Sequence, residues 1–192
     1  MDKLSPMKEH DIRALMKKGA LSNELEYERA LSADRTLRLL VKEDSALKEL
    51  RKELRNLITR YEEGHWSEED RVTDQQIKES DLVERVVENE RQFIRNRKEI
   101  ILERLSKLDL KQQDLGELLD HNKSYTSELL NGVRAFSSGD LILIHRLLGI
   151  KLKDLFLTTV PLATQKRVKA SIAKILSKKV KLKEKDLVLV SA

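Results

Sequence analysis

The stretch from Leu110 to Arg134, LKQQDLGELLDHNKSYTSELLNGVR, places hydrogen-bonding side chains around two short amphipathic segments. Such an arrangement suits contact with duplex DNA, because the first turn of the second of two short helices can enter the major groove. In that groove Lys donates to guanine O6 and N7, and Ser can act as donor or acceptor. The candidate DNA-contacting residues are Gln112, Asn122, Lys123, Ser124, Tyr125, Ser127, Asn131 and Arg134.

Two roles are expected among these candidates. Lys123 and Ser124 lie on the outward face near the start of the second segment, where they would meet base edges. Gln112 at the start of the first segment and Arg134 after the second would hold phosphates. Glu128 either accepts a hydrogen bond from cytosine N4 or repels the phosphate backbone, and the sequence leaves both readings open.

The corner between the two segments must be tight, with apolar contacts on its inner side. Gly116 is small where the two helices would cross. One corner residue needs a positive φ, which Asp120 or Asn122 can adopt at modest cost. Asn122 can also cap the second helix. The apolar residues expected to face one another across the corner are Leu115 and Leu119, on one side, and Thr126, Leu129 and Leu130 on the other.

The elements around this corner are predicted to be short helices that form a compact bundle. The bundle segments are 111–119, 123–130, 139–148 and 153–157, with Pro161 closing the series. In front of them, apolar residues recur from Val83 to Leu108 and predict a helix over most of the span from Asp81 to Lys107.

The N-terminal half is predicted to contain a helical hairpin. The segment 23–44 would fold back on 45–61, in which Leu47, Leu50, Leu54, Leu57 and Tyr61 repeat at alternating spacings of three and four. The simpler interpretation of this stripe is core within the chain. The functional interpretation is a surface for a partner, and its candidate residues are Tyr27, Leu31, Leu54, Leu57, Tyr61 and Trp66.

Composition narrows the class of protein. The 192 residues include 37% charged and 4% aromatic side chains, six Gly and two Pro, which favours an all-α fold. There is no Cys, so disulfides and thiolate metal sites are excluded, and a cytoplasmic location is expected. The N-terminus lacks the apolar core of a signal peptide, and the longest apolar run, LILI at 141–144, is far too short to span a membrane.

The sequence offers little that would support catalysis or a cofactor. The four histidines, His10, His65, His121 and His145, have no metal-ligand spacing, and no glycine-rich phosphate loop is present. We therefore expect no enzyme activity, no metal and no cofactor.

Charge is distributed unevenly along the chain. Residues 160–192 carry nine Lys or Arg against two acids, which is a net +7, whereas the whole chain is +5 and the remainder is therefore −2. A basic C-terminal helix and tail on a slightly acidic body would meet a polyanion near the C-terminus. Within that tail, the segment DLVLV at 186–190 is either a short strand or an unpaired end.

Two parts of the sequence resemble known families. The landmarks L-x-Q-x-D-L-G-x-L-L, L-N-G-x-R and L-L-G-I in residues 91–157 resemble the repressor/Cro-type (XRE-type) helix-turn-helix domain. The segment NELEYERAL and the later YEEGHW resemble the N-terminal part of HigA-type antitoxins, with matches at Tyr27, Ala30, Leu31 and 61–63. Departures are Gly116 in place of Ala, Asp120 in place of the turn Gly, Thr126 in place of an aliphatic residue, a longer connection after Trp66 without the family's prolines, and the basic tail.

The resemblance implies an antitoxin of a type II toxin–antitoxin module. Its partners would be double-stranded operator DNA, a HigB-like mRNA-cleaving toxin and a second copy in a homodimer, with recognition helices about 34 Å apart. The expected organisation is an N-terminal helical partner-binding hairpin or bundle at 1–66, a charged helical linker at 67–90, a five-helix repressor-type helix-turn-helix domain at 91–160 and a basic helix and tail at 161–192. The alternatives are a stand-alone XRE-type regulator that dimerises through its N-terminal half, and an adaptor that never touches DNA.

Overall fold

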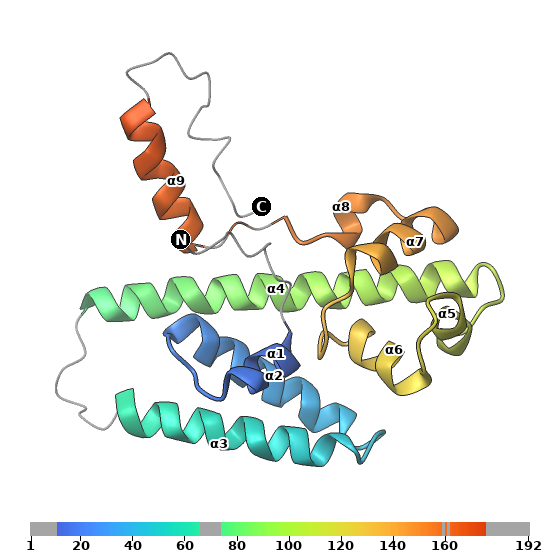
Figure 1. The fold of residues 1–192 in the computed structure, drawn as a ribbon, viewed down its shortest axis with the longest axis horizontal. Coiled ribbons are helices and arrows are strands. Elements are labelled where there is room, and N and C mark those ends of the chain that lie inside the picture. Colours follow the sequence, from blue (N-terminus) through green and yellow to red (C-terminus); the bar gives the residue numbers. More distant parts are fainter. Residues whose placement is uncertain (1–10, 66–73, 159, 161, 176–192) are drawn as a thin grey trace.

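The computed structural model describes residues 11–65, 74–158, 160 and 162–175, and within these residues the fold is helical without a strand (Figure 1). The expected all-α class is confirmed. The helices are α1 (Ile12–Lys18), α2 (Glu24–Leu40), α3 (Leu47–His65), α4 (Asp74–Ser106), α5 (Gln112–Leu118), α6 (Lys123–Leu130), α7 (Ser138–Leu148), α8 (Leu152–Leu155) and α9 (Leu162–Ile175). None of the described helices is both long and apolar enough to cross a bilayer.

The long helix α4 is the spine of the molecule (Figure 1). Helices α1, α2 and α3, which we call the N-terminal unit, lie along its first half, and α2 packs directly on it. Helices α5 to α8 surround its second half and form with it the C-terminal bundle. Because α4 runs from 74 to 106 without a break, the boundary expected at residues 90 and 91 lies inside one helix. Residues 74–90 of the predicted linker and the first helix of the bundle therefore belong to a single helix.

The N-terminal unit is built on the antiparallel packing of α2 against α3. Arg51 of α3 binds Asp34 of α2 with an Nε–Oδ1 distance of 2.8 Å, and Tyr27 of α2 donates to Glu62 Oε1 at 2.9 Å. The core of this unit contains Ile12, Leu21, Ala30, Ala33, Leu37, Leu40, Leu47, Leu54, Leu57, Ile58, Tyr61 and, from the other end of the chain, Val133.

The C-terminal bundle has a second core, which α4 supplies with Ile101 and Leu105. Helix α7 begins with a capping box, in which Ser137 Oγ accepts from Asp140 N at 3.0 Å, and ends at Gly149 with a φ of 62°. Arg97 of α4 is 1% exposed and lies over the Phe136 ring at 4.8 Å. One of its guanidinium nitrogens also donates to the carbonyl of Leu155 at 3.3 Å, so this side chain ties α4 to α8.

The two cores meet at the C-terminal end of α6. Val133 is fully buried in the core of the N-terminal unit, and its carbonyl accepts from Ile12 N at 3.2 Å. This contact joins residues that are far apart in sequence, so the N-terminal unit is docked on the bundle. Helix α9 projects away from α4 in Figure 1. Trp66 and the DLVLV segment lie outside the described residues.

Candidate functional site

The corner between α5 and α6 is held by backbone geometry that the sequence largely anticipates. Asp120 adopts a φ of 56°, the left-handed conformation expected at Asp120 or Asn122. His121 N then donates to the carbonyl of Gly116 at 2.8 Å, which closes the corner. Asn122 has an extended backbone, and its Oδ1 accepts from Tyr125 N at 2.8 Å. Asp120 therefore makes the turn, and Asn122 caps the N-terminus of α6.

Gly116 and Thr126 form the crossing point of the two helices. A Cβ added at Gly116 would lie 2.8 Å from the His121 carbonyl oxygen and 2.9 Å from Thr126 Oγ1. Thr126 is fully buried, and its hydroxyl donates to the Asn122 carbonyl at 3.0 Å. Gly116 and Thr126 both depart from the repressor pattern, and the two departures are linked. The missing side chain at Gly116 leaves the space that the Thr126 hydroxyl and the His121 carbonyl occupy.

This corner presents the first turn of α6 on the surface. Asn122, Lys123 and Ser124 are exposed there, whereas Tyr125 and Ser127 are half-buried. Gln112, also half-buried, is the first residue of α5. The candidates expected to meet base edges, Lys123 and Ser124, are thus the accessible ones.

A loop of the N-terminal unit contacts this exposed turn. Ser124 Oγ donates to Asp44 Oδ2 at 3.0 Å, and Asp44 lies between α2 and α3. The other carboxylate oxygen of Asp44 accepts from Ala46 N at 3.0 Å, near the start of α3. A candidate base-reading hydroxyl is therefore paired with an acid of the N-terminal unit, 80 residues away in sequence.

Glu128 is the centre of an ion-pair cluster on the far side of α6. Its carboxylate is 7% exposed and accepts two hydrogen bonds of 2.7 Å from Arg13 and one of 2.6 Å from Arg134. Burial opposes ionisation of this carboxyl, but the hydrogen bonds from Arg13 and Arg134 outweigh it and lower the pKa of Glu128. In this arrangement both carboxylate oxygens of Glu128 accept hydrogen bonds from arginines, and the pair with Arg13 holds α1 against α6.

The remaining candidates are positioned by neighbours inside the molecule. The Arg134 guanidinium lies 4.7 Å above the Tyr125 ring, which stabilises both side chains through a cation–π contact. Asn131 donates to the Ser127 carbonyl at 2.8 Å, and its Oδ1 accepts from Lys98 Nζ at 2.8 Å. Asn131 and Arg134 follow the end of α6, near α4 and the N-terminal unit, whereas Tyr125 belongs to the first turn of α6.

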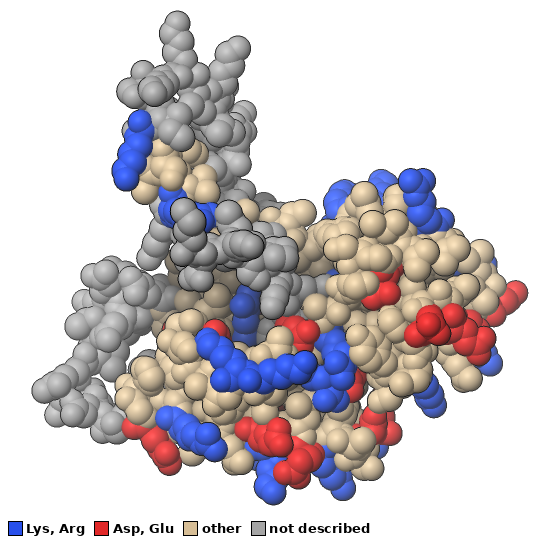
Figure 2. Space-filling view, in the orientation of Figure 1, with Lys and Arg blue, Asp and Glu red and all other residues tan. Residues whose placement is uncertain are grey.

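The charge of this region is unfavourable for a general attraction to phosphate. Residues 109–134 contain five acids and three bases. Figure 2 shows acidic side chains gathered over α5, whereas Lys and Arg form a band over α1 and α2. Electrostatic attraction to a polyanion must therefore come from outside the corner.

The stripe proposed for partner binding is mostly internal. Leu54, Leu57 and Tyr61 are buried in the core of the N-terminal unit, and Tyr27 and Leu31 pack partly buried against it. Tyr27 and Tyr61 stack with their ring centroids 4.9 Å apart. Burial, together with the nearby Glu24 carboxylate, raises the pKa of Tyr61 to about 12. In this conformation the core interpretation accounts for the buried residues of the stripe.

Three contacting residues, Arg13, Asp44 and Lys98, carried no signal in the sequence, because each meets the α6 region from a distant element. Among the residues that the structure describes, no group of three His, Asp or Glu side chains is placed to hold a metal ion. Comparisons with protein-family models, curated proteins and solved structures find no match to this chain.

Proposed function

We propose that this chain is a DNA-binding regulator in which α5 and α6 act as a helix-turn-helix. The observation that carries the proposal is the corner itself: the left-handed Asp120, the Asn122 cap and the close contact of Gly116 with Thr126. Together they hold two short helices rigidly and leave Lys123 and Ser124 exposed at the start of α6. A rigid helix with exposed donors in its first turn is what major-groove reading requires.

The loop that carries Asp44 has to move for this reading to occur. The carboxylate is 3.0 Å from Ser124 Oγ, and it would repel DNA phosphates beside the groove. The N-terminal unit therefore sets how accessible α6 is. A partner that binds this unit and shifts the loop would change DNA affinity, which couples the two halves.

We further propose that the N-terminal unit binds a partner protein, as in HigA-type antitoxins, where the partner would be a HigB-like toxin. What supports this is the resemblance of residues 23–31 and 61–63, together with an N-terminal α-helical unit that has its own core and lies outside the α5–α6 corner. On this proposal the protein acts as a homodimer that represses its own operon. A stand-alone XRE-type regulator remains the alternative, in which the same unit serves dimerisation.

The DNA-binding proposal is tested with the double substitution Lys123→Ala and Ser124→Ala in the full chain. Fluorescence anisotropy with duplexes from the region upstream of the gene should show at least tenfold weaker binding, because each base contact is worth about 1–3 kcal/mol. The matched control is Lys153→Ala with Ser138→Ala, which removes the same two side-chain types from exposed positions of α8 and α7.

The control should bind like the unaltered protein, with a circular dichroism spectrum unchanged in all three. Equal affinity of the Lys123→Ala, Ser124→Ala protein and the control would contradict the assignment of α6. For the partner proposal, the test is co-purification of the full chain with the product of the adjacent gene. If the product of the adjacent gene is not retained with the full chain and appears in the flow-through, the stand-alone regulator would be favoured.

A further inference from the structure

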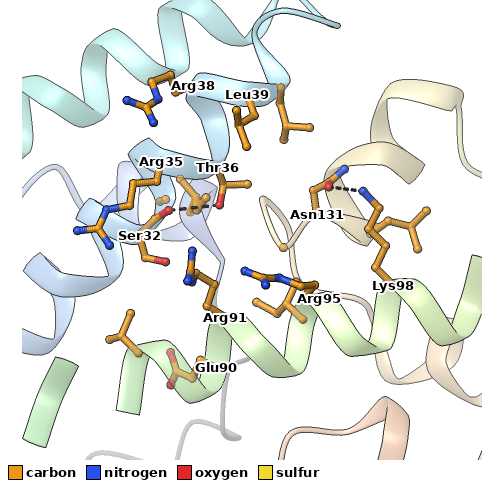
Figure 3. Close-up of a pocket in the computed structure, with 17 residues that line it drawn as sticks. Ser32, Arg35, Thr36, Arg38, Leu39, Glu90, Arg91, Arg95, Lys98 and Asn131 are labelled. Carbon is orange, nitrogen blue, oxygen red and sulfur yellow. Dashed lines mark hydrogen bonds between the residues drawn. The ribbon is translucent and has the colours of Figure 1, made fainter. Parts of the chain in front are cut away.

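A cavity of about 400 Å³ lies between α2, α4 and the turn that follows α6 (Figure 3). Five basic side chains line it. Arg35 and Arg38 come from α2, and Arg91, Arg95 and Lys98 come from α4. Figure 3 shows Arg91 reaching from α4 toward α2, while Lys98 turns toward Asn131 at one end of the cavity. We refer to this cavity as the basic groove.

The basic charge of the groove is only partly balanced by its neighbours. Arg35, Arg38 and Arg95 make no hydrogen bond or ion pair with any residue that the structure describes. The only acid among the lining residues, Glu90, is buried and paired with Arg29, which does not line the cavity. Arg91 is paired with Glu88 at 2.8 Å. The Glu88 carboxylate also interacts with Arg35 and Arg95, and Glu28 interacts with Arg35, so the five lining bases are accompanied by one lining acid and two acids outside the lining.

The like charges of the groove are close neighbours along each of its two helices. Arg35 and Arg38 are three residues apart on one helix, and Arg91 and Arg95 are four apart on the helix that faces it. Like charges at these spacings are neighbours on a helix surface and destabilise it. An anion between two facing helices that both carry such pairs would reduce this repulsion and stabilise the packing of the helices.

The floor of the groove is apolar. Ala33, Leu40 and Val87 are buried beneath the basic side chains, whereas Leu39 at the rim is 60% exposed. The groove therefore offers two kinds of surface. The basic side chains suit an acidic group, and the exposed Leu39 with the apolar floor suits an apolar group.

One end of the groove is closed by a tight backbone contact. Gly132 has a φ of 69°, and an added Cβ would lie 2.8 Å from Ile94 Cδ1. The turn after α6 therefore lies directly on α4, and Lys98 is fixed there by its 2.8 Å hydrogen bond to Asn131 Oδ1. The groove is thus walled at this end, although it is open to solvent along its length.

We propose that the basic groove binds a small organic anion that carries an apolar group. The acidic head would lie beside Arg91 and Arg95 of α4, whose planar guanidinium groups suit carboxylate or phosphate oxygens, and Arg38 would add positive charge from the α2 side (Figure 3). The apolar part would cover Leu39 and the floor of the groove. The volume lies within the range of small-molecule sites, of about 300–1,000 Å³, and a duplex DNA backbone is too wide to enter a cavity of this size.

The test uses the full chain and four compounds in isothermal titration calorimetry, each below its micelle concentration. Decanoate and decyl phosphate have both chemistries, decanol has only the apolar chain, and inorganic phosphate has only the charge. We expect saturable binding of one equivalent of decanoate or decyl phosphate, and at least tenfold weaker binding of decanol and of inorganic phosphate. Decanol or inorganic phosphate binding as tightly as decyl phosphate would overturn the proposal.

A pair of variants locates the site. Arg38→Ala with Arg95→Ala should weaken decyl phosphate binding at least tenfold and leave the thermal midpoint of the empty protein unchanged or higher, because like-charge repulsion is relieved. The matched control is Arg60→Ala with Arg104→Ala, two exposed arginines outside the groove, which should bind decyl phosphate like the unaltered protein. Equal binding by both variants, or displacement of decyl phosphate by a short DNA duplex of unrelated sequence, would overturn the proposal.

Discussion

Gly116→Ala tests the corner between α5 and α6 most directly. In an ordinary helix interior this change stabilises a protein by about 1 kcal/mol, because alanine has the higher helix propensity. Here the new Cβ would lie 2.8 Å from the His121 carbonyl oxygen and 2.9 Å from Thr126 Oγ1. Both distances are well inside van der Waals contact, so the neighbours must move.

Neither neighbour can move freely. The His121 backbone is fixed by its 2.8 Å hydrogen bond to the Gly116 carbonyl, and the Thr126 hydroxyl by its 3.0 Å hydrogen bond to the Asn122 carbonyl. Extra volume in such a packed site costs about 1–3 kcal/mol, and displaced hydrogen bonds add about 1 kcal/mol. Set against the gain in propensity, the net expectation is a loss of about 1–3 kcal/mol in the free energy of unfolding.

The measurement is urea denaturation followed by far-ultraviolet circular dichroism. Gly139→Ala is the matched control, since Gly139 lies in the first turn of α7 and an added Cβ would meet only Ser137 Oγ at 3.5 Å. The control should be neutral or slightly stabilising. Adding Thr126→Ala to Gly116→Ala should recover part of the loss, as a coupling of about 0.5–2 kcal/mol in a double-mutant cycle. A Gly116→Ala protein that is more stable than the unaltered chain would refute the close crossing of the helices.

Two further predictions concern the acids that join the halves of the molecule. Glu128→Gln should reduce the free energy of unfolding at pH 7 by about 2–3 kcal/mol, somewhat below the cost of breaking a fully buried pair because Arg13 and Arg134 are partly exposed. Because the pKa of Glu128 is lowered in the folded state, its contribution to stability is complete above the unfolded pKa of about 4.3 and is lost as the pH falls through the folded pKa. The unaltered protein should therefore lose stability more steeply below about pH 4 than Glu128→Gln. Parallel plots of the free energy of unfolding against pH for the two proteins would speak against the cluster. Asp44→Asn keeps an acceptor for Ala46 N but removes a negative charge, whose repulsion of a phosphate about 6 Å away in water costs about 0.7 kcal/mol. DNA affinity should therefore rise roughly threefold at low salt and by less at high salt. An unchanged affinity in anisotropy titrations at both salt concentrations would place the loop away from bound DNA.

The corner could be predicted from sequence because its determinants are local. A residue that tolerates positive φ, a cap two residues later and a small residue at the crossing all lie within 11 positions of one another, from Gly116 to Thr126. Each is fixed by backbone sterics or a short-range hydrogen bond, so residue type alone carries the information. The functional contacts beyond this corner, including operator DNA and toxin, stay predictions.

The docking of the two halves could not be predicted in this way. Arg13 and Glu128 are 115 positions apart, and Asp44 and Ser124 are 80 apart, so no periodicity relates them. The same holds for the basic groove, whose arginines read as ordinary exposed residues on two separate helices. The charged span before residue 90 was expected to be a helical linker, and α4 runs through its residues 74–90. What the sequence does not reveal is the surface that buries Val86 and Val87.

The energies of these contacts decide which part of the molecule must move when DNA binds. Undocking the whole N-terminal unit would expose Val133 and Ile12, both almost fully buried, and would break the Arg13–Glu128 pair, at a cost of several kcal/mol. Moving the loop alone breaks the exposed hydrogen bond between Ser124 and Asp44, which is worth about 1 kcal/mol. On the proposed function, DNA binding therefore shifts the loop while the unit stays docked. An anion in the basic groove, which bridges α2 and α4, would reinforce that docking and would leave the loop free to move.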